Sequence, residues 1–434
     1  MSSRDWESVK LREITSKITK GTTPTTIGAS FVDKGINFIK SESITASRIL
    51  DRSKYAFINE ETHKKLLRSQ IMLHDILFSM AGMFLGKTGI VFEQDTPANT
   101  NQAVAIIRVV QDVASYKYVY YYLNQKLIQD YINGSIAQSA QPNINLKEIG
   151  DININLPPLH EQKSIADTLS CLDDMIELNN HTNQVLEEIA RTIFKRWFVD
   201  FEFLNEDGEP YKSSGGEMVE SELGEIPKGW RVAKLEDALL VIEAGNRPKG
   251  GASNLDNGIP SIGAENIIGL GEYDFSKEKY VPEEYFELMN KGIVNNWDVM
   301  LYKDGAQIGR KTMFAQDFPH KKCCINSHVF ILRCNDLITQ PYLYFWLDQD
   351  YMTQNIINLN ANSAQPGINQ PAVKQLKILV PDKETINRFQ DIVEKLLILL
   401  FENCKENRKL TSLRDTLLPK LMSGEIRVPT EEVV

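Results

Sequence analysis

The sequence has few cysteines, no long hydrophobic run and no excess of basic residues. Its 434 residues include five cysteines, none in a CxxC pair, which argues against a disulfide framework and fits a reducing cytoplasm. The longest apolar run, residues 396–401, is too short to cross a bilayer, so we expect no membrane contact. A formal net charge of −10 argues against a protein coated in basic surface.

The charge is unevenly distributed along the chain. Residues 1–150 contain 18 Lys and Arg against 14 Asp and Glu, a net charge of +4. Residues 151–217 contain 5 against 14, a net charge of −9. The N-terminal part can therefore face a phosphate backbone locally, and any DNA contact must rest on local patches. Solvated faces without a partner would give the same pattern.

Apolar residues recur at spacings of three and four over residues 165–197, which is typical of the a and d positions of a heptad repeat. The same pattern returns 224 residues later, and two asparagines lie at the centre of each copy. The predicted helix–helix interface consists of Ile165, Leu169, Leu172, Ile176, Asn179, Asn183, Leu186, Phe389, Val393, Leu396, Leu400, Asn403, Asn407 and Leu410. Buried asparagines pair best with each other and fix the register, but centred pairs meet in parallel and antiparallel helices alike. Each helix would be about 50 Å long.

The repeat extends beyond the helices. The segment DILFSMAGMFLGK at 75–87 matches DVMLYKDGAQIGR at 298–310, and SAQPNIN at 139–145 matches SAQPGIN at 363–369. The chain is thus a duplication in which a globular body precedes each long helix. Each body is of mixed α and β character (α+β), with strands expected at 36–40, 76–80, 90–93 and 104–110 and a helix at 115–132. The tyrosines of that helix are expected to pack it against a sheet.

We divide the chain into five predicted parts. The two bodies are residues 1–150 and 221–376, the central long helix lies within residues 151–204, and the distal one lies within residues 377–434. Residues 205–220, rich in Gly, Ser and acidic side chains, form the linker between the halves.

Two motifs resemble a nucleotide-binding loop and a zinc site, but both are incomplete. AGMFLGKT at 81–88 has Ala81 where a Walker A loop needs glycine, and a strand follows where that loop needs a helix. The group His320, Cys323, Cys324, His328 and Cys334 matches no common zinc spacing, and the first half has no counterpart. A methyltransferase acting on base nitrogens would need a glycine-rich cofactor loop and a Pro-Pro-aromatic loop, neither of which is present. We therefore expect a non-catalytic chain without a bound metal.

Four segments carry a family resemblance. They are SELGEIPKGW at 221–230, LPPLHEQKSIA at 156–166, RTIFKRWFVDF at 191–201 and LRDTLLPKLMSGEI at 413–426. With the duplicated body-and-helix plan, the chain resembles the specificity subunit of type I restriction–modification systems.

The resemblance implies a non-catalytic reader of double-stranded DNA. Each body would be a target recognition domain for one half of a split sequence, and the two helices would pack as an antiparallel coiled coil between pseudo-twofold-related halves. The helices would dock two modification subunits, which bring S-adenosylmethionine for methylation. Restriction subunits, which bring ATP and magnesium, would complete the nuclease complex.

The residues that contact DNA are predicted from loops shared by both copies. Basic residues at Lys20, Lys87, Arg247, Lys249 and Arg310 are the candidates for phosphate contact. Gln141 and Gln365 are candidates for base contact, because glutamine can bond adenine through two hydrogen bonds, although a turn role fits them equally. Two other functions stay open at this point: an interaction scaffold that binds no DNA, and a stand-alone DNA methyltransferase.

Overall fold

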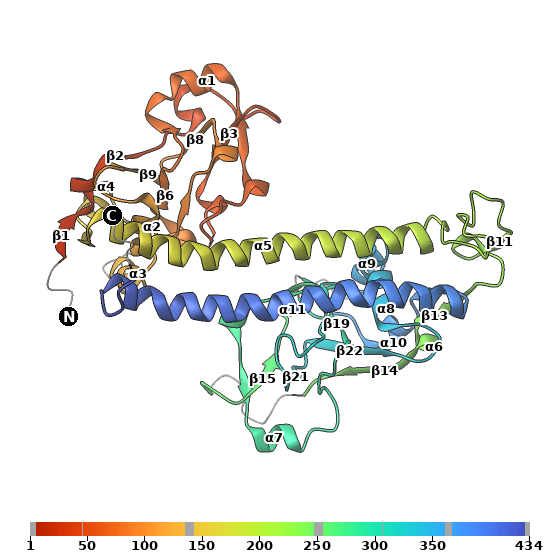
Figure 1. Cartoon of the computed structure of the whole chain (residues 1–434). Coiled ribbons are helices and arrows are strands. Elements are labelled where there is room, and N and C mark those ends of the chain that lie inside the picture. The colour runs from red at the N-terminus through yellow and green to blue at the C-terminus, as the bar shows by residue number, and fades with distance from the viewer. Residues whose placement is uncertain are drawn as a thin grey trace. The chain divides into compact units, whose positions relative to one another are not determined.

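The computed structural model describes residues 6–45, 47–134, 143–246, 255–305, 307–360 and 367–429. The chain divides into two compact units. Unit 1 comprises Met1–Asp174 together with Leu410–Val434, and unit 2 comprises Met175–Lys409. Each unit therefore contains one body and a part of both long helices (Figure 1).

The described part of unit 1 contains two four-stranded sheets and a two-stranded ladder. The first sheet has the antiparallel order β2–β9–β6–β7. The second has the order β4–β3–β8–β5, in which β3 and β8 are parallel, and the ladder joins β1 to β10. The strands are β1 (Glu7–Lys10), β2 (Thr15–Lys20), β3 (Ile36–Ile39), β4 (Ala56–Ile58), β5 (Gln70–Ile71), β6 (Ile76–Ser79), β7 (Thr88–Ile90), β8 (Ala98–Thr100), β9 (Val104–Val109) and β10 (Asn153–Leu156).

Aromatic packing holds α2, one of the helices of unit 1, to the first sheet. The helices are α1 (Glu60–Lys65), α2 (Tyr116–Leu123), α3 (Lys126–Gly134) and α4 (Leu146–Gly150). Tyr118, Tyr120, Tyr121 and Tyr122 are buried in the core together with strand residues of β6 and β9. The expected packing role of these tyrosines is confirmed. Tyr116 is half-buried and stacks on His74, with ring centroids 4.2 Å apart.

Unit 2 repeats this arrangement around the antiparallel sheet β14–β22–β19–β20. Its strands are β11 (Met218–Ser221), β12 (Gly224–Pro227), β13 (Arg231–Lys234), β14 (Leu239–Ala244), β15 (Ile259–Ile262), β16 (Ile267–Gly269), β17 (Glu272–Tyr273), β18 (Tyr280–Val281), β19 (Val299–Tyr302), β20 (Lys311–Met313), β21 (Cys324–Ile325), β22 (Val329–Cys334) and β23 (Lys377–Val380). Its helices are α6 (Leu235–Ala238), α7 (Glu283–Glu287), α8 (Gln340–Asp348), α9 (Asp350–Asn358) and α10 (Gln370–Lys374).

The two long helices are α5 (Leu159–Phe198) and α11 (Lys383–Met422) (Figure 1). In unit 2, Asn183 accepts a hydrogen bond from Asn403 at 2.9 Å, and Asn179 donates one to Asn407 at 3.0 Å. Residue numbers thus rise along α5 as they fall along α11. The helices are antiparallel, and the expected fold class is confirmed.

The heptad positions differ in burial along the helices. Ile165 and Leu169 are buried in the core of unit 1, so this end of the repeat packs against the body as well. Leu186, Phe389, Val393 and Leu400 are buried in the same way in the core of unit 2. The remaining predicted positions are half-buried, namely Leu172, Ile176, Asn179, Asn183, Leu396, Asn403, Asn407 and Leu410.

Two expected elements are wrong in their bounds. The strand expected at 90–93 is β7 at Thr88–Ile90, because Thr88 and Ile90 pair with Phe78 and Ile76 of β6. The helix expected at 115–132 is divided into α2 and α3. It breaks at Asn124, whose side chain donates to the Thr88 hydroxyl at 2.5 Å and to the Tyr120 carbonyl at 2.7 Å.

A buried ion pair recurs at equivalent places in the two central sheets. Asp75 accepts two hydrogen bonds from the Arg108 guanidinium, both at 2.7 Å, and one from the Met72 amide at 2.7 Å. In unit 2, Asp298 accepts two from Arg333, both at 2.6 Å. Burial raises the pKa of Asp298 although Arg333 opposes the shift, so the carboxylate depends on its partner. These pairs tie neighbouring strands together.

Candidate nucleic-acid interface

In unit 1, several loops leave the first sheet at the same edge. Lys20 at the end of β2 pairs with Ala105 near the start of β9, and Ala105 pairs with Phe78 near the end of β6. Phe78 in turn pairs with Thr88, the first residue of β7. Because neighbouring strands lie about 4.8 Å apart, this row spans about 14 Å. We call this the strand-end edge of unit 1 (β2, β6 and β9 are labelled in Figure 1).

The turn from β6 to β7 has a defined backbone. Gly82 and Gly86 have φ values of 73° and 80°, which favour glycine. The Ser79 amide donates to the Lys87 carbonyl at 2.9 Å, and the Met80 amide donates to the Ala103 carbonyl at 2.8 Å. The turn is therefore fastened both across its own base and to the start of β9.

The segment before α4 also reaches this edge. The Ile144 amide donates to the Met80 carbonyl at 2.9 Å, and Asn143 forms a bridge with Ala81. The loop after β2 is held there as well, since the Thr22 amide donates to the Thr100 carbonyl at 3.0 Å. A Cβ at Gly21 would lie 1.9 Å from the same carbonyl oxygen, so this close approach requires glycine.

Unit 2 builds the same edge. Ala244, Phe330, Leu301 and Lys311 form the corresponding row across β14, β22, β19 and β20. A Cβ at Gly245 would lie 1.7 Å from the Ile325 carbonyl oxygen, which repeats the constraint at Gly21.

The turn bonds of unit 2 also repeat those of unit 1. The Tyr302 amide donates to the Arg310 carbonyl at 2.8 Å, and the Lys303 amide donates to the His328 carbonyl at 3.1 Å. The Ile368 amide donates to the Lys303 carbonyl at 2.9 Å. Both strand-end edges thus share one backbone design.

The predicted phosphate-contacting residues that are described lie at these edges. Lys20 is exposed. Lys87 is half-buried, with its ammonium nitrogen 5.1 Å from the centre of the Phe84 ring. Arg310 donates to the Ile267 carbonyl at 2.9 Å and to the Gln307 side chain at 2.6 Å, so its guanidinium is partly engaged. Gln141, Arg247, Lys249 and Gln365 lie outside the described residues.

A polar pair that was not predicted from the sequence lies at the edge of unit 2. The His328 ring nitrogen Nδ1 lies 2.9 Å from an oxygen of the Asp304 carboxylate. Both side chains are partly exposed, at 39% and 34% of their surface. The signal was present in the repeat, because unit 1 has Ala81 and Ala103 at the matching positions.

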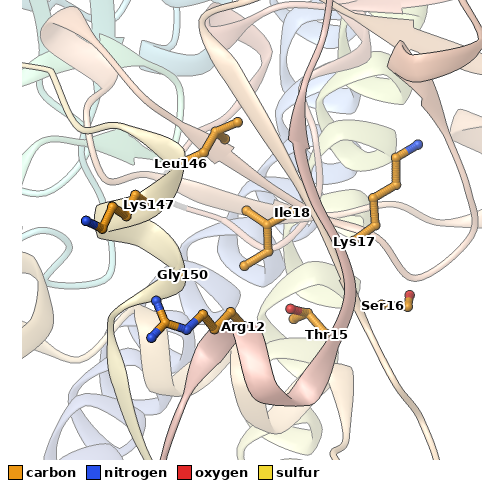
Figure 2. A pocket seen from close by; sticks show the side chains of 8 residues that line it. All are labelled: Arg12, Thr15, Ser16, Lys17, Ile18, Leu146, Lys147 and Gly150. Carbon is orange, nitrogen blue, oxygen red and sulfur yellow. The ribbon is translucent and has the colours of Figure 1, made fainter.

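A surface cavity of about 350 Å³ lies near the start of β2 (Figure 2). Its lining includes Arg12, Lys17 and Lys147, but Lys17 points to the opposite side of β2 from Ile18 and Lys147. Arg12 is also paired with Asp151, and the hydrogen bond from Lys10, together with the charge of Arg12, lowers the pKa of the Asp151 carboxyl. These cations do not converge on one point, so the cavity is not the candidate interface.

The Cys and His side chains of unit 2 have other partners. His320 pairs with Glu278 and His328 with Asp304. Burial raises the pKa of the Cys324 thiol to about 11, which disfavours the thiolate that a metal would need. Among the described residues, no group of three or more His, Cys, Asp or Glu side chains is arranged to hold a metal ion.

Two similar units, each with one body and a part of two antiparallel helices, define a duplicated chain. The model of the family described as type I restriction modification DNA specificity domain matches residues 3–188 and 227–410. The chain belongs to this family.

The relatives agree with this membership. The type I restriction enzyme MjaIX specificity subunit of Methanocaldococcus jannaschii is 25% identical over 432 residues, covering 98% of this chain and 94% of the relative. The HindI specificity subunit of Haemophilus influenzae is 26% identical over 356 residues, covering 67% and 73%. The crystal structure of a type I S subunit from M. genitalium shares the fold, with a TM-score of 0.57, 16% identity and 96% coverage of both chains.

A search of the described helices for membrane spans found none with both the length and the apolar character that crossing a bilayer requires.

Proposed function

We propose that this chain is the specificity subunit of a type I restriction–modification complex and recognises a bipartite duplex DNA target. The observation that carries the proposal is the pair of strand-end edges. The backbone bonds that fasten their turns are the same, yet their side chains differ at matching positions. One scaffold with two sets of side chains suits the recognition of two different half-sites.

The predicted division of the chain follows from this proposal. Residues 1–150 and 221–376 are the two target recognition domains, and both strand-end edges fall within these ranges. The long helices, within 151–204 and 377–434, act as the spacer, and residues 205–220 link the halves. Two readers on one face of B-DNA would stand about one helical turn, roughly 34 Å, apart, which helices of about 50 Å can span.

Catalysis on this proposal belongs to the partner subunits. Family membership indicates a non-catalytic chain that needs no cofactor of its own. Two modification subunits would supply S-adenosylmethionine for methylation, and restriction subunits would supply ATP and magnesium. The complex would work in the cytoplasm, where these partners meet DNA.

The docking surface for a modification subunit is proposed on α5 within unit 2. Met175, Leu178, Val185 and Ile189 are exposed, with Leu178 at 64%. Their spacings of three, seven and four residues place them in one stripe, separate from the asparagine positions that face α11. An apolar heptad stripe on an exposed helix suits a partner helix of matching pattern. On α11, Ile392 and Leu399 offer a smaller stripe for the second modification subunit.

The salt dependence of DNA binding tests the proposed interface. The chain, purified with its modification subunit, would be titrated with target duplex at several salt concentrations. Replacing both Lys20 and Lys87 by alanine is expected to weaken binding and to reduce the log–log salt slope by about 1.8, because each lost phosphate contact contributes about 0.9. Fluorescence anisotropy gives both quantities.

The matched control replaces Lys64 and Lys65 of α1, which carry the same charge and pair with Glu60 and Glu61. An unchanged slope in that variant would assign the effect to the edge. An equal change in both variants would mean that only net charge matters, and absence of DNA binding by the wild type would favour an interaction scaffold.

A further inference from the structure

We propose that Asp304 and His328 form a base-contacting group in unit 2, which recognises an exocyclic amino group of adenine or cytosine in one half of the target. The inference rests on the proposed function, since it assigns a role to one strand-end edge. It concerns specificity at one base pair, which the phosphate contacts cannot provide.

The pair lies at the centre of the edge of unit 2. Asp304 belongs to the turn between β19 and β20 and forms a bridge with Gly367, and His328 directly precedes β22. The side chains therefore come from two different loops and meet at 2.9 Å where those loops leave the sheet. Each keeps more than a third of its surface open to solvent.

The fold does not need this pair. Unit 1 has alanines at both positions, Ala81 and Ala103, and still forms the same turn. In both units a backbone bond ties the turn to the strand start, from Met80 to Ala103 at 2.8 Å and from Lys303 to His328 at 3.1 Å. A side-chain bond that adds nothing to the scaffold, at an edge proposed to face DNA, is a candidate for recognition.

Charged side chains from the neighbouring segments lie near Asp304 and His328. The Lys303 ammonium lies 3.6 Å from the Asp304 carboxylate. Glu265 bonds Lys279 at 2.5 Å. Burial raises the pKa of Glu265, but the hydrogen bond from Lys279 and the charge of Lys279 lower it overall, so this carboxylate stays ionised. Both acidic side chains near His328, Asp304 and Glu265, thus have a lysine partner.

The geometry sets the chemistry of recognition. A carboxylate accepts hydrogen bonds, so the contact with Asp304 places the proton of neutral His328 on Nδ1. The other ring nitrogen, Nε2, is then an acceptor. Acceptors suit the amino groups of adenine N6 and cytosine N4 in the major groove, whereas guanine and thymine present acceptors of their own there. The pair therefore discriminates the bases that present an amino group in the major groove, adenine and cytosine, from guanine and thymine.

The test uses the chain in complex with its modification subunit, on duplexes carrying its methylation target. Each base pair of both half-sites is substituted in turn, and affinities are measured for the wild type and for the double variant Asp304→Ala, His328→Ala, which copies unit 1. The double variant is expected to lose about tenfold on the cognate duplex and to lose discrimination at one base pair of one half-site. Placing an analogue without the amino group there should cost the wild type the same factor and cost the variant nothing.

The control variant removes an exposed pair elsewhere in unit 2, Glu283→Ala with Lys322→Ala, whose charged groups lie 3.6 Å apart. It should leave discrimination intact at every position. An equal loss of affinity on all duplexes would assign Asp304 and His328 to structure or phosphate contact, and no loss would also overturn the proposal. Failure of the proposed function is distinct, because the wild type would then prefer no sequence at all.

Discussion

Replacing Leu178, Val185 and Ile189 together by glutamine is expected to abolish co-purification of the chain with its modification subunit. All three side chains are exposed on one stripe of α5 in unit 2. If each contributes about 1.5 kcal/mol on burial against a partner helix, the total of about 4.5 kcal/mol corresponds to a thousandfold or greater loss of affinity. The measurement is pull-down followed by size-exclusion chromatography of the co-expressed subunits.

The fold should survive this change, since glutamine is a good helix former and the three positions are exposed. The thermal unfolding midpoint is therefore expected to stay within a few degrees of the wild type. The control replaces Leu240 and Leu288, which are 73% and 86% exposed in unit 2 but lie off the long helices, by glutamine. If that variant also failed to co-purify, or if the α5 variant assembled normally, the docking stripe would be misplaced.

The second large effect concerns the stability of unit 1. Asp75→Ala is expected to lower the free energy of unfolding by about 3 kcal/mol, because it leaves the Arg108 guanidinium without its buried carboxylate. The Met72 amide would also lose its acceptor. Urea denaturation followed by circular dichroism measures the loss, and hydrogen exchange on β6 and β9 locates it.

A double variant distinguishes the cost of leaving Arg108 unpaired from the cost of losing the whole ion pair. Asp75→Ala combined with Arg108→Leu should be more stable than Asp75→Ala alone, since no unpaired charge remains. Asp151→Ala serves as the control, because its partners Lys10 and Arg12 are partly exposed and solvent screens such pairs, so they contribute little to stability. A loss at Asp75 no larger than that at Asp151 would contradict the importance of the buried pair.

The helix pair was predictable because its signal is local and periodic. The spacing of apolar residues predicted the two long helices, and the offset of 224 residues between the copies showed which positions correspond. The heptad positions did not predict whether the two helices run parallel or antiparallel, since asparagines at the centre of both helices meet in either orientation. The resemblance supplied it, and the contact between Asn183 and Asn403 agrees.

The candidate interface was only partly predictable. Loops around Lys20 and Lys87 are 67 residues apart in sequence, and only the strand order β2–β9–β6–β7 brings them to one edge. Such an order depends on long-range pairing that periodicity does not report. The pair of Asp304 and His328 was not predicted, because the candidate residues came from loops that both copies share. Positions at which the copies differ within a shared backbone are the better guide to specificity.

The most direct test of the central claim is long-read methylome sequencing of cells that co-express this chain with a modification subunit of the same system. We predict one split motif with methyladenine in each half, absent without the chain. Exchanging residues 1–150 for the matching body of a relative should change one half of the motif and leave the other intact. A soluble complex with the modification subunit that methylates no split motif would contradict the claim that the two units recognise DNA.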